Sequence, residues 1–186
     1  MTASDIIAAL EPLVPGVVYE AGTSSDESRT PTILLPAEAL LATCEALRSG
    51  PGLEFVAFSN VTAVDYHPGR DPRFEVVYHL VSPHRRARVR LKVRVGADQS
   101  IASVTSVWPG AGWPEREVFD LFGIVFDGHE DLRRLLMPED WEGHPLRKDY
   151  PVQLRKEAKT YMPLQVTAEE FRASMERDRH VRSKPE

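Results

Sequence analysis

A strict alternation of apolar and basic side chains over residues 88–95 limits the possible folds of this chain more than any other feature. The apolar positions are Val89, Leu91, Val93 and Val95, and the basic positions between them are Arg88, Arg90, Lys92 and Arg94. Because successive side chains of a β-strand point to opposite faces, this period of two predicts a strand with one buried and one solvated face. Such strands are typical of an antiparallel sheet that is wet on one side.

Other segments extend this strand into an α+β fold. Residues 74–80 alternate in the same way, residues 54–65 are rich in Val, Phe and Thr, and shorter strands are expected over residues 16–20 and 103–107. The predicted class is α+β, with an antiparallel-rich sheet, helices packed on one face, and an extended C-terminal arm after them. We expect a globular domain over residues 1–126 and a partner-docking arm and tail over residues 127–186.

Three helices are expected beside these strands. Ser4 is a candidate N-cap for a short helix at the start of the chain. Over residues 36–49 the apolar positions fall on one helical face and include Cys44, which is therefore expected to fill the core rather than to react. Pro114 lies in the first turn of a third helix, where its missing N–H is harmless, and Gly123 can end that helix.

Composition argues against several classes of function. The formal net charge is -5, so general affinity for nucleic acid is not expected. The single cysteine, Cys44, can form no internal disulfide and cannot hold an iron–sulfur cluster, which typically needs about four thiolate ligands. With no membrane-spanning run and no signal-peptide pattern in view, a bacterial cytoplasmic location is the simplest expectation.

Residues 139–151, with the sequence EDWEGHPLRKDYP, combine dense charge with anchoring side chains. The charges would need partners if this segment were buried. Trp141, Leu146 and Tyr150 would nevertheless be unusual in a purely solvated loop. An ordered segment that lies over the surface of another protein reconciles both features, because interfaces use aromatic anchors flanked by ionic pairs.

The segment from Trp113 to Pro151, WPEREVFDLFGIVFDGHEDLRRLLMPEDWEGHPLRKDYP, resembles the signature region of the C subunit of respiratory complex I, the NADH–quinone oxidoreductase. The family pattern contains an acidic-Arg-acidic triplet, DLFGI, a Gly-His pair, DLRR and MPEDWEGHPLRKDYP, and this sequence matches it almost throughout. A match of this length is far more specific than a short motif. One departure is Glu130, where the family often has proline.

This resemblance implies a cofactor-free scaffold, a non-catalytic subunit of an enzyme that transfers electrons from NADH to quinone and translocates protons. FMN, iron–sulfur clusters and the quinone site would belong to partner subunits. The chain would pack mainly on the D subunit, with the B and I subunits nearby, at the cytoplasmic side of the bacterial inner membrane. The implied docking residues are Glu115, Arg116, Glu117, Arg133, Arg134, Asp140, Trp141, His144, Pro145, Leu146, Arg147, Lys148, Asp149, Tyr150 and Pro151.

Some of these residues have a plainer alternative. Helix-surface ion pairs are common and weak, so Glu115, Arg116 and Asp120 could instead brace the chain internally. Residues 152–186 are expected to be a partner-contacting extension, in which Thr167 and Glu170 have the spacing of a capping box.

Two further functions stay open from the residues alone. A metal-dependent hydrolase could use the carboxylates and imidazoles near Asp131 and His144, although their spacing fits no standard metal motif and a turn-bonding role for the histidines is simpler. A nucleic-acid module could use the basic residues 88–94. Within the resembled class, the quinone and the electron donor, NADH or another carrier, are set by other subunits.

Overall fold

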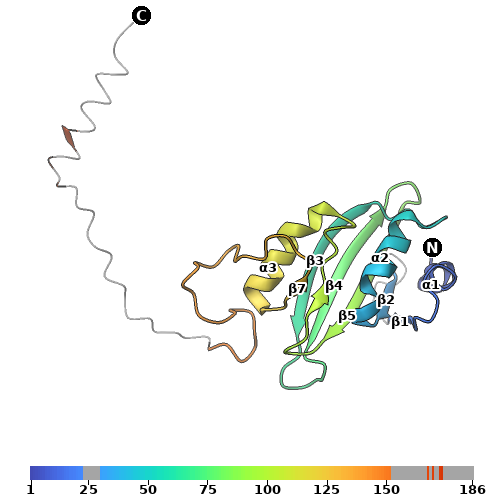
Figure 1. Cartoon of the computed structure of the whole chain (residues 1–186), viewed down its shortest axis with the longest axis horizontal. Coiled ribbons are helices and arrows are strands. Elements are labelled where there is room, and N and C mark those ends of the chain that lie inside the picture. Colours follow the sequence, from blue (N-terminus) through green and yellow to red (C-terminus); the bar gives the residue numbers. More distant parts are fainter. Residues whose placement is uncertain (23–29, 152–166, 168, 170–171, 174–186) are drawn as a thin grey trace, which may run out of the picture. The chain divides into compact units, whose positions relative to one another are not determined.

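In the computed structural model of the chain, five strands form the central sheet in the order β1-β2-β5-β4-β3 (Figure 1). Their bounds are β1 (Glu20–Gly22), β2 (Thr32–Leu35), β3 (Ala57–Asp65), β4 (Phe74–Ser82) and β5 (Ala87–Val95). Three neighbouring pairs are antiparallel, whereas β2 and β5 run parallel. The predicted α+β class is confirmed, and the parallel pair is a feature that the alternation does not reveal.

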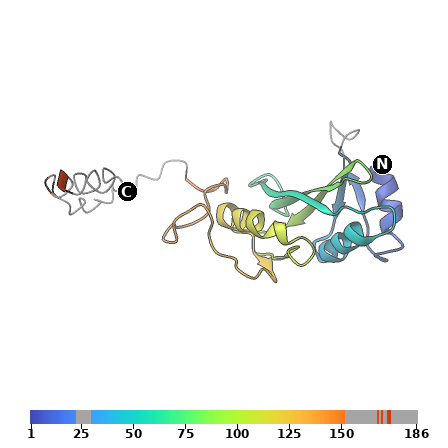
Figure 2. The same ribbon diagram turned by 90° about the horizontal axis from the view of Figure 1, so that it is seen from above.

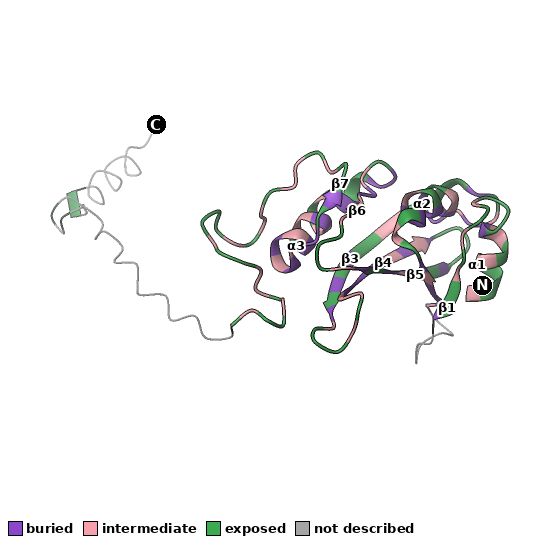
Figure 3. Ribbon diagram, turned by 60° about the horizontal axis from the view of Figure 1, so that its bottom comes forward, coloured by how far each residue is buried: buried purple, intermediate pink, exposed green. Residues whose placement is uncertain are grey.

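Three helices complete the layer on the apolar side of the sheet. They are α1 (Ala3–Leu10), α2 (Leu40–Ser49) and α3 (Gly112–Phe122), with short 3-10 turns at η1 (Ala37–Ala39) and η2 (Pro109–Ala111) before α2 and α3. Figure 2 shows α2 and α3 on the same side of the sheet. A two-stranded parallel ladder of β6 (Ile101–Ala102) and β7 (Phe126–Asp127) lies beside α3 (Figure 3).

The core forms between the sheet and the helices, as the alternation predicts. The four apolar side chains of β5 from Val89 to Val95 have no exposed surface, and Arg88 and Arg94 on the other face are exposed. The same change from buried to exposed along the strands is visible in Figure 3. Cys44 on α2 is also fully buried, which confirms its place in the core.

Three sequence predictions about elements and their ends were wrong. The N-cap of α1 is Thr2 rather than Ser4, because Thr2 and Asp5 exchange hydrogen bonds as a capping box. The first strand begins at Glu20 instead of residue 16. No strand forms over residues 103–107, because both backbone groups of Val104 are used elsewhere. Its N–H donates to the Glu115 carboxylate, and its carbonyl accepts from the N–H groups of Val107 and Trp108 in the following turn.

The structure describes residues 1–22, 30–151, 167, 169 and 172–173. Met1–Tyr150 forms one compact unit and Pro151–Glu186 a second, and the sheet, the three helices and the core all belong to the first. The division predicted after residue 126 stays a prediction. The expected capping box at Thr167 and Glu170, and most of its helix, lie outside the described residues. Among those described, no helix is long and apolar enough to span a membrane.

Candidate functional site

Helix α3 supports the segment on which the docking prediction depends. Val118 and Phe122 bury one face of the helix against the core, and Gly123 ends it in the left-handed conformation, with φ 74°. A side chain at Gly123 would lie 2.5 Å from the His144 ring and 2.6 Å from Nη2 of Arg147. Only glycine therefore lets residues 131–150, which we call the strap, lie this close to the helix end.

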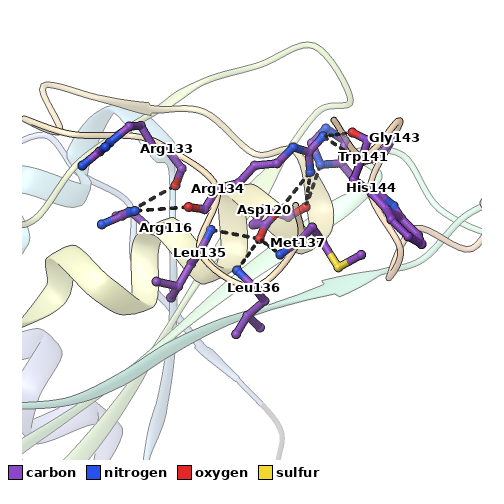
Figure 4. Close-up of polar contacts among 10 residues, drawn as sticks. All are labelled: Arg116, Asp120, Arg133, Arg134, Leu135, Leu136, Met137, Trp141, Gly143 and His144. Carbon is purple, nitrogen blue, oxygen red and sulfur yellow. Dashed lines mark hydrogen bonds and ion pairs between the residues drawn. The ribbon is translucent and has the colours of Figure 1, made fainter. Parts of the chain in front are cut away.

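Asp120 on α3 is the main anchor of the strap (Figure 4). Its side chain has no exposed surface, and its Oδ2 accepts the backbone N–H groups of three consecutive strap residues, Leu135, Leu136 and Met137, at 3.0, 2.7 and 2.8 Å. Its Oδ1 accepts from Nη1 of Arg134 at 2.8 Å. Arg134 then donates from Nη2 to the carbonyls of Trp141 and Gly143, at 2.9 and 3.1 Å, so one ion pair connects the helix with two parts of the strap.

These contacts fix the charge of Asp120. Burial by itself would raise the pKa of this carboxyl, but the hydrogen bonds from the Met137 amide, the Arg134 guanidinium and the other two amides outweigh it. The pKa of Asp120 therefore lies below its usual value, and the carboxylate is ionised at neutral pH. A buried charge with four donors in hydrogen-bonding distance stabilises one arrangement of the strap.

The strap also satisfies the free carbonyl groups at the end of α3. The imidazole Nδ1 of His144 donates to the Asp120 carbonyl at 2.9 Å, and the N–H of Leu146 donates to the Leu121 carbonyl at 3.0 Å. Arg147 donates from Nε to the carbonyl of Phe122 at 2.5 Å. Because the C-terminal end of a helix carries partial negative charge, a guanidinium is favourable there.

A second buried carboxylate, Asp65 at the end of β3, holds the far end of the strap. It accepts from Nε and Nη2 of Arg73 at 2.9 and 2.7 Å, and from the N–H of Lys148 at 2.8 Å. Arg73 also bonds both carboxylate oxygens of Asp149, at 2.9 and 2.7 Å. Burial acts to raise the pKa of Asp65, but the hydrogen bonds from Arg73, Lys148 and His67 outweigh it and hold that pKa well below its usual range.

Arg116 joins the start of the strap to α3. It donates from Nε and Nη2 to the carbonyls of Arg133 and Arg134, both at 3.1 Å, and its guanidinium carbon lies 5.0 Å from the ring centre of Trp113. Trp113 is 65% exposed. It borders a cavity of about 450 Å³, whose wall also contains His129 and Asp131.

The docking residues implied by the resemblance fall into groups that differ in exposure. Glu115 has no exposed surface, and its carboxylate accepts from Ser103 Oγ at 2.6 Å and from the N–H of Val104 at 2.8 Å. A fully buried side chain cannot contact another protein directly, so Glu115 is an internal brace rather than a docking residue. The exposed members are Glu117, Arg133, Asp140, Leu146, Lys148, Asp149 and Pro151, and the partly buried ones are Arg116, Arg134, Trp141, His144, Pro145, Arg147 and Tyr150.

Several charges that were expected to meet another protein have partners within the chain. Arg147 bonds the end of α3, Asp149 bonds Arg73, and Arg134 pairs with Asp120. For these residues a contact with another protein stays a prediction. The sequence contains no sign of the roles of Asp65 and Arg73, because they lie far from the strap and carry no motif, and it indicates Asp120 only as one of three possible internal braces.

The residues of the alternative metal site have other partners. His129 donates from Nε2 to the carbonyl of Gly112 at 3.0 Å and accepts the N–H of Asp131 on Nδ1 at 3.0 Å, so the turn-bonding role expected for it is confirmed. His144 bonds the Asp120 carbonyl at the end of α3. Within the described part of the chain, no three His, Cys, Asp or Glu side chains lie close enough to hold a metal ion, so the hydrolase alternative has no site there.

Comparison with known proteins identifies the family. Residues 33–156 match the family described as "Respiratory-chain NADH dehydrogenase, 30 Kd subunit". The C subunit of the NADH-quinone oxidoreductase of Roseiflexus sp. (strain RS-1) is 52% identical over 125 residues, which are 67% of this chain and 71% of that protein. The corresponding C subunit of Sinorhizobium medicae (strain WSM419) is 50% identical over 121 residues, 65% of this chain and 60% of that protein.

Solved structures agree on the fold. The trypsin-resistant fragment (1–134) of Nqo5 is 31% identical, with a TM-score of 0.54 over 71% of this chain and 100% of that chain. A chain of the archaeal membrane-bound sulfane sulfur reductase is similar at 23% identity and a TM-score of 0.65, over 80% of this chain and 85% of that one, and shows the fold alone. The family match covers most of the sheet, all of α3 and the whole strap. The chain therefore belongs to the family of the 30 kDa subunit of respiratory-chain NADH dehydrogenase, in which its relatives are C subunits of NADH-quinone oxidoreductases.

Proposed function

We propose that this chain is a non-catalytic docking subunit of an NADH–quinone oxidoreductase, and that its strap lies against the D subunit. The B and I subunits would lie nearby, with the assembled arm at the cytoplasmic side of the membrane. FMN, the iron–sulfur clusters and the quinone site would belong to the partner subunits. The proposal rests on the family membership and on the strap, which is anchored on its inner side and exposes apolar side chains on its outer side.

The observation that carries the proposal is the contrast between the two sides of the strap region. The inner side is held by two buried carboxylates, Asp65 and Asp120. The outer side presents apolar side chains to water: Leu136 is 60% exposed, Leu146 51% and Trp113, on the neighbouring helix, 65%. Apolar side chains that are held in a fixed arrangement and left uncovered favour association, because little conformational freedom remains to be lost on binding.

The chemistry of the described side chains supports a structural role. Burial, followed by the nearby Glu115 and Glu45 carboxylates, raises the pKa of the Cys44 thiol, which keeps it in its unreactive protonated form. The ionisable groups around the strap, Asp120, Asp65 and Arg134, each bond backbone groups or one another. Their chemistry fits the anchoring of a binding surface.

A matched pair of substitutions tests the docking role. Leu146→Asp places a charge on the outer side of the strap, and Val56→Asp places one at a similarly exposed site, with 51% and 47% exposure respectively, away from the strap. We expect the Leu146 variant to lower both the amount of assembled complex and its quinone reductase activity, with activity per assembled complex unchanged. The Val56 variant should assemble normally.

Two results would contradict the proposal. Equal assembly of both variants would show that the strap does not dock. A loss of activity per assembled complex, with normal assembly of the Leu146 variant, would place the chain closer to the reaction than a docking role allows.

A further inference from the structure

Within the residues that the structure describes, the face of the sheet opposite α2 and α3 is open along β5 and basic. Figure 2 shows α2 and α3 on the other side. Arg88, Arg90, Lys92 and Arg94 project from β5 onto the open face, at a spacing of about 7 Å between alternate residues of a strand. In a chain with a net charge of -5, this row concentrates positive charge on one surface.

Only part of this charge is neutralised within the described residues. Lys92 Nζ lies 2.8 Å from Oε1 of Glu75, which also pairs with Arg70 at 3.1 Å. Arg88 and Arg94 are exposed and form no ion pair with any residue that the structure describes. The carboxylate of Glu75 is thus already shared between two cations, and two guanidinium groups at the ends of the row can pair with carboxylates of a partner.

A cavity lies at one end of the row. It has a volume of about 260 Å³ and is lined by Val18, Glu20, Leu34, Leu35, Pro36, Lys92 and Arg94. Val18 is 75% exposed, the largest exposed fraction among the exposed large apolar residues that the structure describes. Apolar walls beside two cations suit a side chain that combines an apolar stem with a carboxylate. The volume is below the range of about 300–1,000 Å³ that is usual for small-molecule sites.

We propose that this open face is a second docking surface, and that it receives an acidic segment of another protein subunit. This role rests on the assembly role of the chain, but it belongs to a surface distinct from the strap. Carboxylates of the segment would pair with Arg88 and Arg94, and one of its side chains would enter the cavity beside Val18. Complementary charge of this kind sets the register and the partner of an interface more than its total affinity.

The composition of the face favours protein over the other anionic partners. The outward positions of β4 that pair with the basic row are Glu75, Val77, His79 and Val81, and none of them is the Phe, Tyr or Trp that sequence-tolerant nucleic-acid sites use as stacking platforms. A lipid headgroup layer is flat and does not require a cavity with apolar walls. A protein segment can use both the charges and the cavity.

Cross-linking in the assembled complex gives the direct test. A carbodiimide joins a lysine amine to a carboxylate in contact with it, so Lys92 is a natural probe and Arg94→Lys adds a second amine without changing the charge. We expect both amines to be joined to Asp or Glu of another subunit. Arg48→Lys, which adds an exposed amine on α2, serves as the control and should give no such product. Products that join the two amines only to carboxylates of this chain, such as Glu75, would overturn the proposal.

Charge reversal provides an independent readout. Arg88→Glu combined with Arg94→Glu should reduce the amount of the chain retained in the complex after a high-salt wash by about tenfold relative to Arg48→Glu. All three residues are exposed, so unchanged thermal melting of the purified variants would show that folding is intact. Equal retention would overturn the proposal and leave the strap docking role, tested at Leu146, unaffected. The purified chain can also be tested for binding to phosphatidylglycerol vesicles and to duplex DNA. If the wild-type chain binds either one and the double variant does not, the face belongs to that partner and the proposal is overturned.

Discussion

Replacing Asp120 with asparagine should release the strap while leaving the core folded. One oxygen of the carboxylate accepts a hydrogen bond from Arg134, and the other accepts from three backbone N–H groups. An asparagine has one acceptor oxygen, so its NH2 group would face either the guanidinium or the amides. Breaking a buried ion pair costs about 3–5 kcal/mol. Because the Arg134 side chain retains 19% exposure and can recover some hydration, we expect roughly 2–3 kcal/mol here.

That loss should appear in the opening of the strap rather than in global unfolding. Helix α3 stays attached to the core through the buried side chains of Val118 and Phe122. Hydrogen exchange at the amides of residues 135–137 should therefore accelerate by roughly 30- to 150-fold, since each 1.4 kcal/mol corresponds to about a factor of ten. Exchange in β4 and β5 should remain as in the wild type.

Asp131→Asn is the matched control for this experiment. The Asp131 carboxylate pairs with Arg133, whose side chain is 71% exposed, and such exposed pairs contribute little to stability. It should leave exchange at residues 135–137 unchanged. If Asp120→Asn also left exchange at these amides within about threefold of the wild type, the anchoring role of Asp120 would be refuted.

The glycine at the end of α3, the two buried aspartates and the buried Glu115 each offer a further test. Gly123→Ala should destabilise the protein more than Gly128→Ala in chemical denaturation. Both residues have positive φ, but only the added Cβ at Gly123 meets other side chains. Equal losses of unfolding free energy would mean that the strap moves to make room for the Cβ at little cost. Acid should release the strap: Asp120 and Asp65 have lowered pKa values in the folded chain, so their stabilisation is complete above the unfolded value near 3.8 and is lost as the pH falls below it. Tryptophan fluorescence against pH measures this, and a release that begins near neutral pH would contradict the assignment. Glu115→Gln should assemble normally and change stability by no more than about 1 kcal/mol at neutral pH. The reason is that burial raises the pKa of this carboxyl and that an amide can keep both hydrogen bonds. A loss of assembly in a variant that still folds would identify Glu115 as a docking residue.

The elements that local patterns determine were predictable from the sequence. The alternation around Val89 predicted a strand with one buried face, and the apolar face containing Cys44 predicted a helix, because side-chain direction follows the local backbone period. The end of α3 at Gly123 was predictable for the same reason, since the left-handed conformation is a property of one residue and its neighbours. The family resemblance likewise depended on a contiguous segment.

Contacts between distant parts of the chain required the tertiary structure. The parallel pairing of β2 with β5 and the bond from Lys148 to Asp65, 83 residues away, leave no periodic signal in either segment. The charges of residues 139–151 correctly indicated that this segment needs partners, but only the fold shows that Arg73 and the end of α3 supply several of them. The physical reason is that a local sequence fixes which way a side chain points, whereas the packing of the whole chain decides which group it meets and whether water is excluded between them.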